Sequence, residues 1–253
     1  MVESVATLLD LRRAFTSHRE AGPRLAFGLP MIDKALGGGL PLGAMHEVQP
    51  SRVLDQGAAA GLAGALAALL SKTNDGKQII WIQHDFVAME IGSLYGADSF
   101  GLPLSSLLIV RVPRVIDVLW GFEEALKCRA VAAVIAEIAE AEAVDLTATR
   151  RLSLAARDGG GLGLLLRHRA CLAPSAAATR WEVASAPGER DQFGGLGHPA
   201  FTLSLIKNRC GPCGHWTIAW DHHERAFLAP ALSRRLAQAA HDRSAHTLPA
   251  RVA

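Results

Sequence analysis

The sequence contains few cysteines, few aromatic residues and no excess of charge of one sign. Four cysteines among 253 residues are too few for the disulfide framework of a secreted protein, so we expect a reducing, cytoplasmic setting. With 26 basic and 24 acidic residues the chain has no overall positive field for nucleic acid, and any DNA contact must come from a local patch. No apolar run approaches the length of a membrane span, and the N-terminus lacks the apolar core of a signal peptide.

A phosphate-binding loop is also missing, at the place where the surrounding pattern predicts one. The stretch Phe27–Val48 reads as a turn, a short helix, a glycine hinge and a buried strand. In a nucleotide-binding protein such a strand leads into G-x-x-x-x-G-K-[ST], whose backbone N–H groups and lysine hold the phosphates. Here Gly57 is followed by Ala58 and Ala59 instead of the lysine and the magnesium-binding hydroxyl, and the nearby Asp55 would repel a phosphate.

Strands and helices alternate through the middle of the chain. The apolar patterns predict strands at 78–82, 107–112, 131–136 and 162–166, and helices at 58–70, 115–127 and 144–157. This alternation indicates βαβ units and a mostly parallel sheet, with right-handed crossovers that place helices on both faces. The predicted fold class is therefore α/β and doubly wound.

The pattern changes near the C-terminus, where strands are predicted at 179–183, 201–207 and 215–221 without helices between them. We interpret these strands as an antiparallel C-terminal extension that ends in a hairpin. The hairpin connection contains the tetrapeptide Cys210-Gly-Pro-Cys213. A redox motif needs its first cysteine at a helix N-terminus, so we interpret the tetrapeptide as a tight turn. Zinc binding with His215, His222 or His223 is the alternative, and the preferred reading includes no metal and no cofactor.

The two ends of the chain differ from the core. Val5, Leu8, Leu11 and Phe15 recur at helical spacing, which predicts an amphipathic N-terminal helix that docks either on its own domain or on a partner. We divide the chain into this helix (1–22), a core (23–228) and a C-terminal tail (229–253).

The order of these elements resembles the core of RecA-type recombinases, and within that superfamily it most resembles the ImuA family. ImuA proteins are RecA-like accessory proteins of the bacterial damage-inducible mutasome. The resemblance rests on the GGGLP entrance, the lost Walker lysine and the KNRxGPxG hairpin, and it covers roughly residues 25–228. It implies a RecA-like fold with a degenerate P-loop.

The resemblance also relates single residues to a nucleotide site. Gly57 matches the last glycine of the loop, while Ala58 and Ala59 replace the lysine and the hydroxyl residue. Glu137 falls where the Walker-B acid would be, and Asp85 lies near the place of the water-activating acid.

Three further positions complete this comparison. Arg167 or His168 matches the residue that senses the γ-phosphate, and Lys207 with Asn208 matches a Lys-Asn pair beside the neighbouring subunit's nucleotide. Acids without the lysine make a repulsive site for a tetra-anion. We therefore expect no catalytic residues, no bound nucleotide and no ATP hydrolysis.

The DNA-binding loops of the family are expected to be shortened in this chain. The second loop is reduced to residues 167–178, which are basic but lack glycine. The candidates for weak phosphate contact are Arg150, Arg151, Arg157, Arg167 and Arg169. They form either an ordinary solvated helix face or a DNA contact whose affinity would depend strongly on salt.

By this resemblance the protein would support SOS-induced, error-prone translesion DNA synthesis without catalysis. The implied partners are an ImuB-type Y-family-like polymerase homologue, the RecA filament and an error-prone replicative-type polymerase. Two alternatives stay open. A SulA-type cell-division inhibitor would cause cell filamentation on expression, and a residual DNA-dependent ATPase would be stabilised by nucleotide.

Overall fold

The computed structural model describes residues 22–73, 76–139, 144–189 and 195–229. The predicted N-terminal helix and nearly all of the C-terminal tail lie outside these residues. The described elements are β1 (Arg24–Leu25), α2 (Pro30–Ala35), β2 (Leu40–Pro41), β3 (Ala44–Pro50), η1 (Val53–Asp55), α3 (Gln56–Ser71), β4 (Gln78–His84), α4 (Asp85–Glu90), η2 (Ala97–Phe100), η3 (Leu104–Ser106), β5 (Leu107–Val112), α5 (Val115–Lys127), β6 (Val131–Ile138), α6 (Leu146–Gly159), β7 (Leu162–Arg167), β8 (Thr179–Ala186), β9 (Ala200–Asn208), β10 (Gly214–Asp221) and β11 (Ala226–Leu228).

A nine-stranded mixed sheet with the order β11-β10-β9-β8-β3-β7-β6-β4-β5 forms the centre of the domain. The strands from β8 to β5 pair in parallel, and β8, β9, β10 and β11 pair antiparallel with one another. The predicted mostly parallel sheet with an antiparallel C-terminal extension is thus confirmed. One detail differs, because β8 pairs in parallel with β3, so the antiparallel part begins at β9. The sequence prediction also missed the short edge strand β11.

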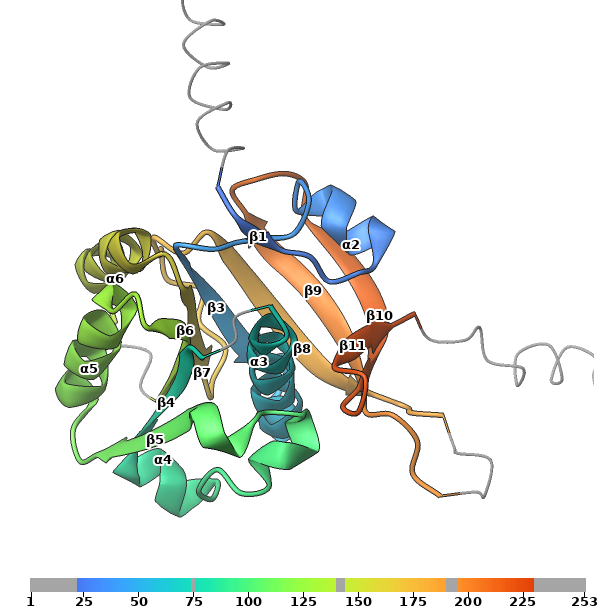
Figure 1. Cartoon of the computed structure of the whole chain (residues 1–253), viewed down its shortest axis with the longest axis horizontal. Coiled ribbons are helices and arrows are strands. Elements are labelled where there is room, and N and C mark those ends of the chain that lie inside the picture. Colours follow the sequence, from blue (N-terminus) through green and yellow to red (C-terminus); the bar gives the residue numbers. More distant parts are fainter. Residues whose placement is uncertain (1–21, 74–75, 140–143, 190–194, 230–253) are drawn as a thin grey trace, which may run out of the picture.

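Helices cover both faces of the sheet (Figure 1). Helix α3 packs on one face in a core that includes Trp81, Trp181 and Trp220, while α5 and α6 pack on the other face in a second core around Phe122. The central strands β6 and β7 are buried along their whole length, as expected for strands covered on both sides. The doubly wound architecture that the alternation predicted is therefore present.

Local sequence signals fix both ends of α6. The Asp145 side chain accepts a hydrogen bond from the Ala148 N–H at 2.7 Å and caps α6, which satisfies one of the free donors of its first turn. Gly160 ends the same helix with a φ of 80°, a conformation that favours glycine. These caps direct the chain from α6 into β7.

One described helix, Val53–Ser71, is long and apolar enough to cross a membrane by length and composition. The sequence prediction of no such run is therefore wrong for this stretch. The helix is the core helix α3 together with the short turn before it, and 61% of its apolar stretch is buried inside the domain. Burial in a protein core accounts for its apolar composition.

Candidate functional site

The carboxyl ends of β3, β4, β6 and β7 meet at one edge of the sheet, where parallel α/β proteins hold their ligands. We call this the carboxyl edge. Helix α3 begins there, directly after β3 and η1. Every residue that the sequence comparison related to a nucleotide site, except Lys207 and Asn208, follows or ends one of these strands.

The chain between β3 and α3 closes onto β8 instead of forming an open phosphate cradle. The Ser51 N–H donates to the Val183 carbonyl at 2.7 Å. The Asp55 carboxylate is fully buried and accepts hydrogen bonds from the Ser185 N–H at 3.0 Å, the Ser185 hydroxyl at 2.8 Å and Arg52 Nε at 3.1 Å. The backbone donor of Ser185 is the main cause that lowers the pKa of Asp55 to about 2. The loop therefore holds an ionised carboxylate at the start of α3 that is already paired with the loop's own arginine.

The residues at the lysine and hydroxyl positions make no polar side-chain contact. Ala59 is completely buried, Ala58 is half-buried and Gly57 is exposed. A Cβ atom at Gly57 would meet nothing within 4 Å. Position 57 therefore has room for a side chain. In a phosphate-binding loop, by contrast, glycine is needed so that the backbone can approach the phosphate closely.

A cavity of about 990 Å³ opens beside the first turns of α3. Gly57, Ala58 and Gly61 line it together with the aromatic side chains of Phe100, Phe201 and Trp220. Among the described residues around it, Glu189 is the one carboxylate and neither lysine nor arginine occurs. The described lining contains the imidazoles of His198 and His222 but no lysine or arginine to pair with a triphosphate.

Glu137, at the Walker-B position, is bonded entirely to protein donors. It is 4% exposed and accepts hydrogen bonds from Trp81 Nε1, from Gln83 Nε2 at 3.3 Å and from His168 Nε2 at 3.0 Å. Both carboxylate oxygens therefore have partners in the folded chain.

Asp85 does not lie against Glu137 in this arrangement. It begins α4 and forms an exposed ion pair with Arg111 at 3.0 Å. The two acids that the sequence comparison placed near a nucleotide are thus engaged separately, one in the interior and one at the surface.

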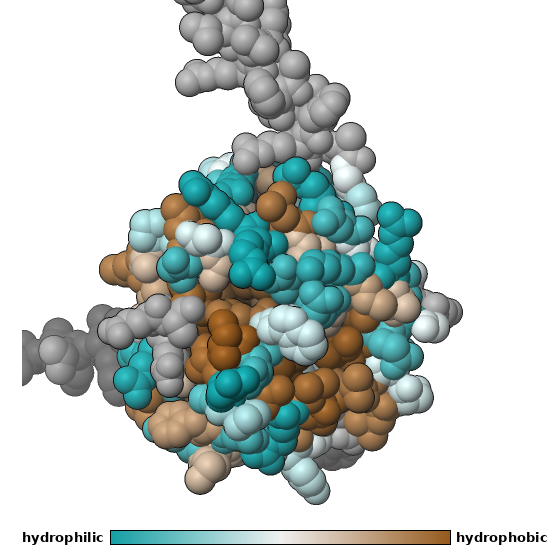
Figure 2. Space-filling view, turned by 90° about the vertical axis from the view of Figure 1, so that its left-hand side faces the viewer, coloured by the Kyte–Doolittle hydropathy of each residue, from teal (hydrophilic) through white to brown (hydrophobic). Residues whose placement is uncertain are grey.

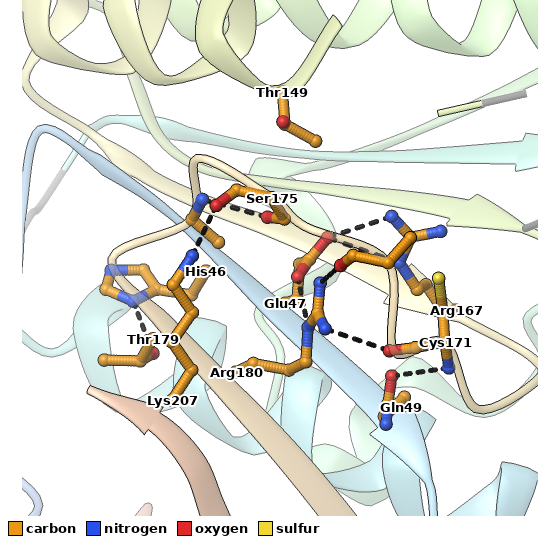
Figure 3. A network of polar contacts seen from close by, with 12 residues as sticks. His46, Glu47, Gln49, Thr149, Arg167, Cys171, Ser175, Thr179, Arg180 and Lys207 are labelled. Carbon is orange, nitrogen blue, oxygen red and sulfur yellow. Dashed lines mark hydrogen bonds and ion pairs between the residues drawn. The ribbon is translucent and has the colours of Figure 1, made fainter. Parts of the chain in front are cut away.

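A second buried carboxylate, Glu47, lies at the centre of a network drawn in Figure 3. Arg167 Nη2 donates to one Glu47 oxygen at 2.9 Å, and Arg180 Nε donates to the other at 2.6 Å. The Glu47 side chain is 0% exposed, and those of Arg167 and Arg180 are 3% and 7% exposed. Burial alone would raise the pKa of Glu47, but the two guanidinium groups outweigh it and hold the pKa below its ordinary value of 4.5.

The same network fixes the shortened second loop, predicted as residues 167–178, of which Arg167 is the last residue of β7. Arg180 Nη1 and Nη2 donate to the carbonyls of Cys171 and Ala173 at 3.0 and 2.8 Å, and the Cys171 N–H donates to Gln49 Oε1 at 3.0 Å. Lys207 Nζ donates to the Ser175 carbonyl. Each of these bonds replaces backbone freedom with a defined position, so this segment is not built as a mobile loop.

Lys207 and Asn208 both act within the chain. Burial, reinforced by the nearby Arg209, lowers the pKa of Lys207. The Asn208 amide donates to the Ala35 and Pro212 carbonyls, each at 2.8 Å, and its oxygen accepts from the Cys210 N–H at 2.9 Å. The Cys210–Cys213 tetrapeptide is therefore the connection between β9 and β10, as predicted, and both thiols are free.

The five arginines proposed to contact DNA do not form one surface. Arg167 is 2% exposed because it pairs with Glu47, so it is unavailable to DNA and its inclusion was wrong. The other candidates are exposed. Arg151 pairs with Glu123 at 2.6 Å, which reduces its local positive charge. DNA contact by Arg150, Arg151, Arg157 and Arg169 stays a prediction.

Sequence reasoning missed the roles of Glu47, Gln49 and Arg180. The available signal was a charged residue inside an apolar strand, because a buried carboxylate needs a buried cation. The sequence could not identify that cation, since Arg180 lies on β8 and is far from Glu47 along the chain.

Comparisons with known proteins identify relatives of this chain in sequence and in fold. The chain is 35% identical over 213 residues to Protein ImuA of Caulobacter vibrioides strain NA1000 / CB15N, covering 79% of this chain and 84% of that protein. The protein of the same name from strain ATCC 19089 / CIP 103742 / CB 15 matches equally well. A crystal structure of the RadB recombinase superposes with a TM-score of 0.51 and 14% identity, covering 82% of this chain and all of that one; this likeness concerns the fold alone. No family model matches the chain.

Proposed function

The chain belongs to the ImuA family and has a RecA-like fold, and from this premise we propose that it is a non-catalytic accessory protein of SOS-induced, error-prone translesion DNA synthesis. It would act in the cytoplasm through protein–protein contacts. Its proposed partners are an ImuB-type polymerase homologue, the RecA filament and an error-prone replicative-type polymerase, because the family implies this mutasome context.

The main support for a non-catalytic role is that the buried carboxylates at the carboxyl edge are bonded to other residues of the chain. In an ATPase the Walker-B acid at this end of the sheet faces the phosphates and magnesium. Here Glu137 is bonded to Trp81, Gln83 and His168, and Glu47 is bonded to Arg167 and Arg180. A ligand would have to break these buried bonds before it gained new ones, and each broken charged pair is costly.

The alanines at the lysine and hydroxyl positions support the same proposal. A Walker lysine and magnesium neutralise the phosphate charge in a dry site. Ala58 and Ala59 offer neither a cation nor a metal ligand, and the nearby Arg52 is already paired with the Asp55 carboxylate. A RecA-like core of this kind would stay bound to a filament or partner without release by hydrolysis.

A complementation assay tests the proposal. A strain that lacks its own copy of the gene should regain damage-induced mutagenesis with the unaltered chain. It should regain mutagenesis equally with Asp85→Asn, because in the described part of the chain Asp85 forms a surface ion pair with Arg111. An ATPase that used Asp85 to activate water would instead lose its activity with this substitution. Loss of mutagenesis with Asp85→Asn, with the variant folded and present at a normal level, would contradict the non-catalytic role. Cell filamentation with unchanged mutagenesis would favour a division inhibitor instead.

Purified proteins test the partner contacts. The full chain should bind the ImuB-type protein of the same organism and the RecA filament assembled on single-stranded DNA. Deletion of residues 1–20 should abolish co-purification and leave the core folded if the N-terminal segment is a contact element. Loss of the fold in the same deletion would indicate that the segment serves its own domain.

A further inference from the structure

Two helices on one face of the sheet carry large apolar side chains that face solvent. Ile116 and Trp120 on α5 are 62% and 66% exposed, and Leu154 on α6 is 57% exposed. Ile116 and Trp120 are four residues apart and therefore lie on the same side of their helix. Figure 2 shows the side of the molecule that carries α5 and α6, where hydrophobic residues gather at the surface among hydrophilic ones. The outer side of this helix pair is thus partly apolar.

An ion pair joins α5 to α6 in the middle of this region. Arg151 Nη2 on α6 lies 2.6 Å from Glu123 Oε2 on α5. Trp120 precedes Glu123 by one helical turn and Leu154 follows Arg151 by one turn, so the two apolar side chains flank the ion pair. Both helices connect parallel strands and therefore run in the same direction. Ile116, Trp120 and Leu154 follow one another along the pair, and we call them the α5–α6 apolar surface.

This surface extends about 15 Å along the helices. From Ile116 to Glu123 there are about seven residues and from Arg151 to Leu154 about three, each with a rise of about 1.5 Å. Single exposed apolar side chains are ordinary. A tryptophan and two aliphatic side chains in one line across two helices instead form a surface that a third helix can cover.

The N-terminal segment, residues 1–21, enters the domain at the C-terminal end of α6. The Leu42 N–H donates to the Pro23 carbonyl at 2.9 Å, and the Gly43 N–H donates to the Gly161 carbonyl at 2.8 Å. Gly161 directly follows the glycine that caps α6. The segment is therefore attached at one end of the α5–α6 apolar surface.

The apolar stripe predicted for the N-terminal segment matches this surface in length. Val5, Leu8, Leu11 and Phe15 recur at helical spacing. As a helix, the stretch from Val5 to Phe15 would cover about 15 Å. Covalent attachment beside the surface gives the segment a high effective concentration there, so contact within the chain is favoured over the same contact with a second copy.

We infer that the N-terminal segment docks on the α5–α6 apolar surface of the same chain as a helix that runs in the direction of α5 and α6. Phe15, the end of the stripe nearer to the attachment point, packs beside Leu154. Val5 packs beside Ile116, and the leucines between them cover Trp120. This inference does not depend on the proposed function, because it concerns contacts within the chain.

Hydrogen exchange of the full chain, followed by mass spectrometry, tests this docking. We expect the amides of residues 5–15 to exchange at least about tenfold more slowly than in an unstructured peptide, because docked elements open rarely. Trp120→Gln with Leu154→Gln should remove this protection, since glutamine retains a good helix propensity but not the apolar contacts. The amides of β6 and β7 should be unchanged in this variant, as a check that the core is folded.

Val53→Gln with Leu54→Gln is the matched control. It changes two apolar residues of 66% and 89% exposure in η1, which leads into α3 on the other face of the sheet. Substitutions at such exposed positions should leave the fold intact. The control should keep the protection of residues 5–15.

Trp120 gives a second readout, from the surface itself. The other four tryptophans are buried or partly buried. Docking shields Trp120 from solvent, so Leu8→Gln with Leu11→Gln should increase the quenching of tryptophan fluorescence by iodide. The increase should disappear when Trp120→Phe is added to that variant, because the newly exposed ring is then absent.

Three results would overturn the inference. Fast exchange of residues 5–15 in the unaltered chain would mean that the segment does not dock. Protection that survives Trp120→Gln with Leu154→Gln would place the segment on another part of the molecule. Protection that falls on dilution, together with a dimer in sedimentation, would assign the surface to the N-terminal segment of a second copy.

Discussion

Glu47→Gln should strongly destabilise the domain, because Glu47 neutralises two guanidinium groups in the interior. The carboxylate is fully buried, and its partners Arg167 and Arg180 are 3% and 7% exposed. An amide keeps the shape and accepts one hydrogen bond at its oxygen, but it leaves two buried cations without a counter-ion. Removing one partner of a buried pair typically costs about 3–5 kcal/mol. For a chain of this size that loss corresponds to a decrease in Tm of roughly 6–20 °C.

Urea unfolding followed by tryptophan fluorescence measures this change, since Trp81, Trp181 and Trp220 are all buried in the core. Glu182→Gln is the matched control. It makes the same substitution on β8, where the carboxylate is half-buried and accepts one exposed hydrogen bond from Ser51 at 3.2 Å. Its cost should stay within about 0.5 kcal/mol. A Glu47→Gln cost below about 1 kcal/mol, no more than one neutral hydrogen bond is worth, would refute the reasoning.

The pH dependence gives an independent check of the same pair. The pKa of Glu47 is lowered in the folded state, because Arg167 and Arg180 outweigh the effect of burial. Stability from such a group is fully present above its unfolded pKa, near 4.5, and is lost as the pH falls toward the lower folded pKa. The gap in unfolding free energy between the unaltered chain and Glu47→Gln should therefore be constant near pH 7 and narrow below about pH 4.5. A gap that widens in acid would contradict the assignment.

Three further changes test other parts of the structure. Asp55→Asn should cost about 1–2 kcal/mol at neutral pH through weaker bonds to Ser185, and the cost should fall between pH 4 and pH 2 because the pKa of Asp55 is about 2; an equal cost at both ends of that range would argue against an ionised, bonded carboxylate. Gly211→Ala should destabilise by roughly 1–3 kcal/mol in urea, because its Cβ would lie 2.4 Å from the Ala35 carbonyl oxygen; a neutral effect would mean that the hairpin does not pack on α2. Gly57→Ala should be neutral or stabilise by up to about 1 kcal/mol, since the position is helical and nothing lies within 4 Å of the new Cβ; strong destabilisation would indicate a constrained, phosphate-loop-like backbone.

The sequence predicted the fold through its hydrophobic periods and its breakers. The predicted strand 107–112 and helix 115–127 coincide with β5 and α5, because apolar runs there are bounded by Pro and by a change of period. The parallel pairing of β8 with β3 could not be predicted from the sequence. The direction of β8 depends on how residues 168–178 return the chain from the carboxyl edge to the start of β3, where the Ala178 N–H donates to the Met45 carbonyl. Sheet order in general is a long-range property that local patterns do not encode.

The sequence predicted which nucleotide-binding residues the candidate site lacks. It did not predict the bonds within the chain that its buried carboxylates form. The alanines at positions 58 and 59 are visible in the sequence. The bonding of Glu137 to Trp81 and His168, and of Glu47 to Arg180, joins residues from different strands. Their charges indicate only that partners must exist. Arg167 illustrates the consequence, because a basic residue that suggested DNA contact in the sequence is an internal counter-ion in the fold.

We propose that this RecA-like core has exchanged nucleotide binding for bonds within the chain, and calorimetry tests this proposal most directly. Magnesium-ATP titrated into the purified full chain should give no saturable heat of binding up to millimolar nucleotide. The same titration should leave the Tm unchanged, because a ligand that does not bind cannot stabilise the folded state. Saturable binding with a micromolar Kd, accompanied by a rise in Tm, would contradict the account.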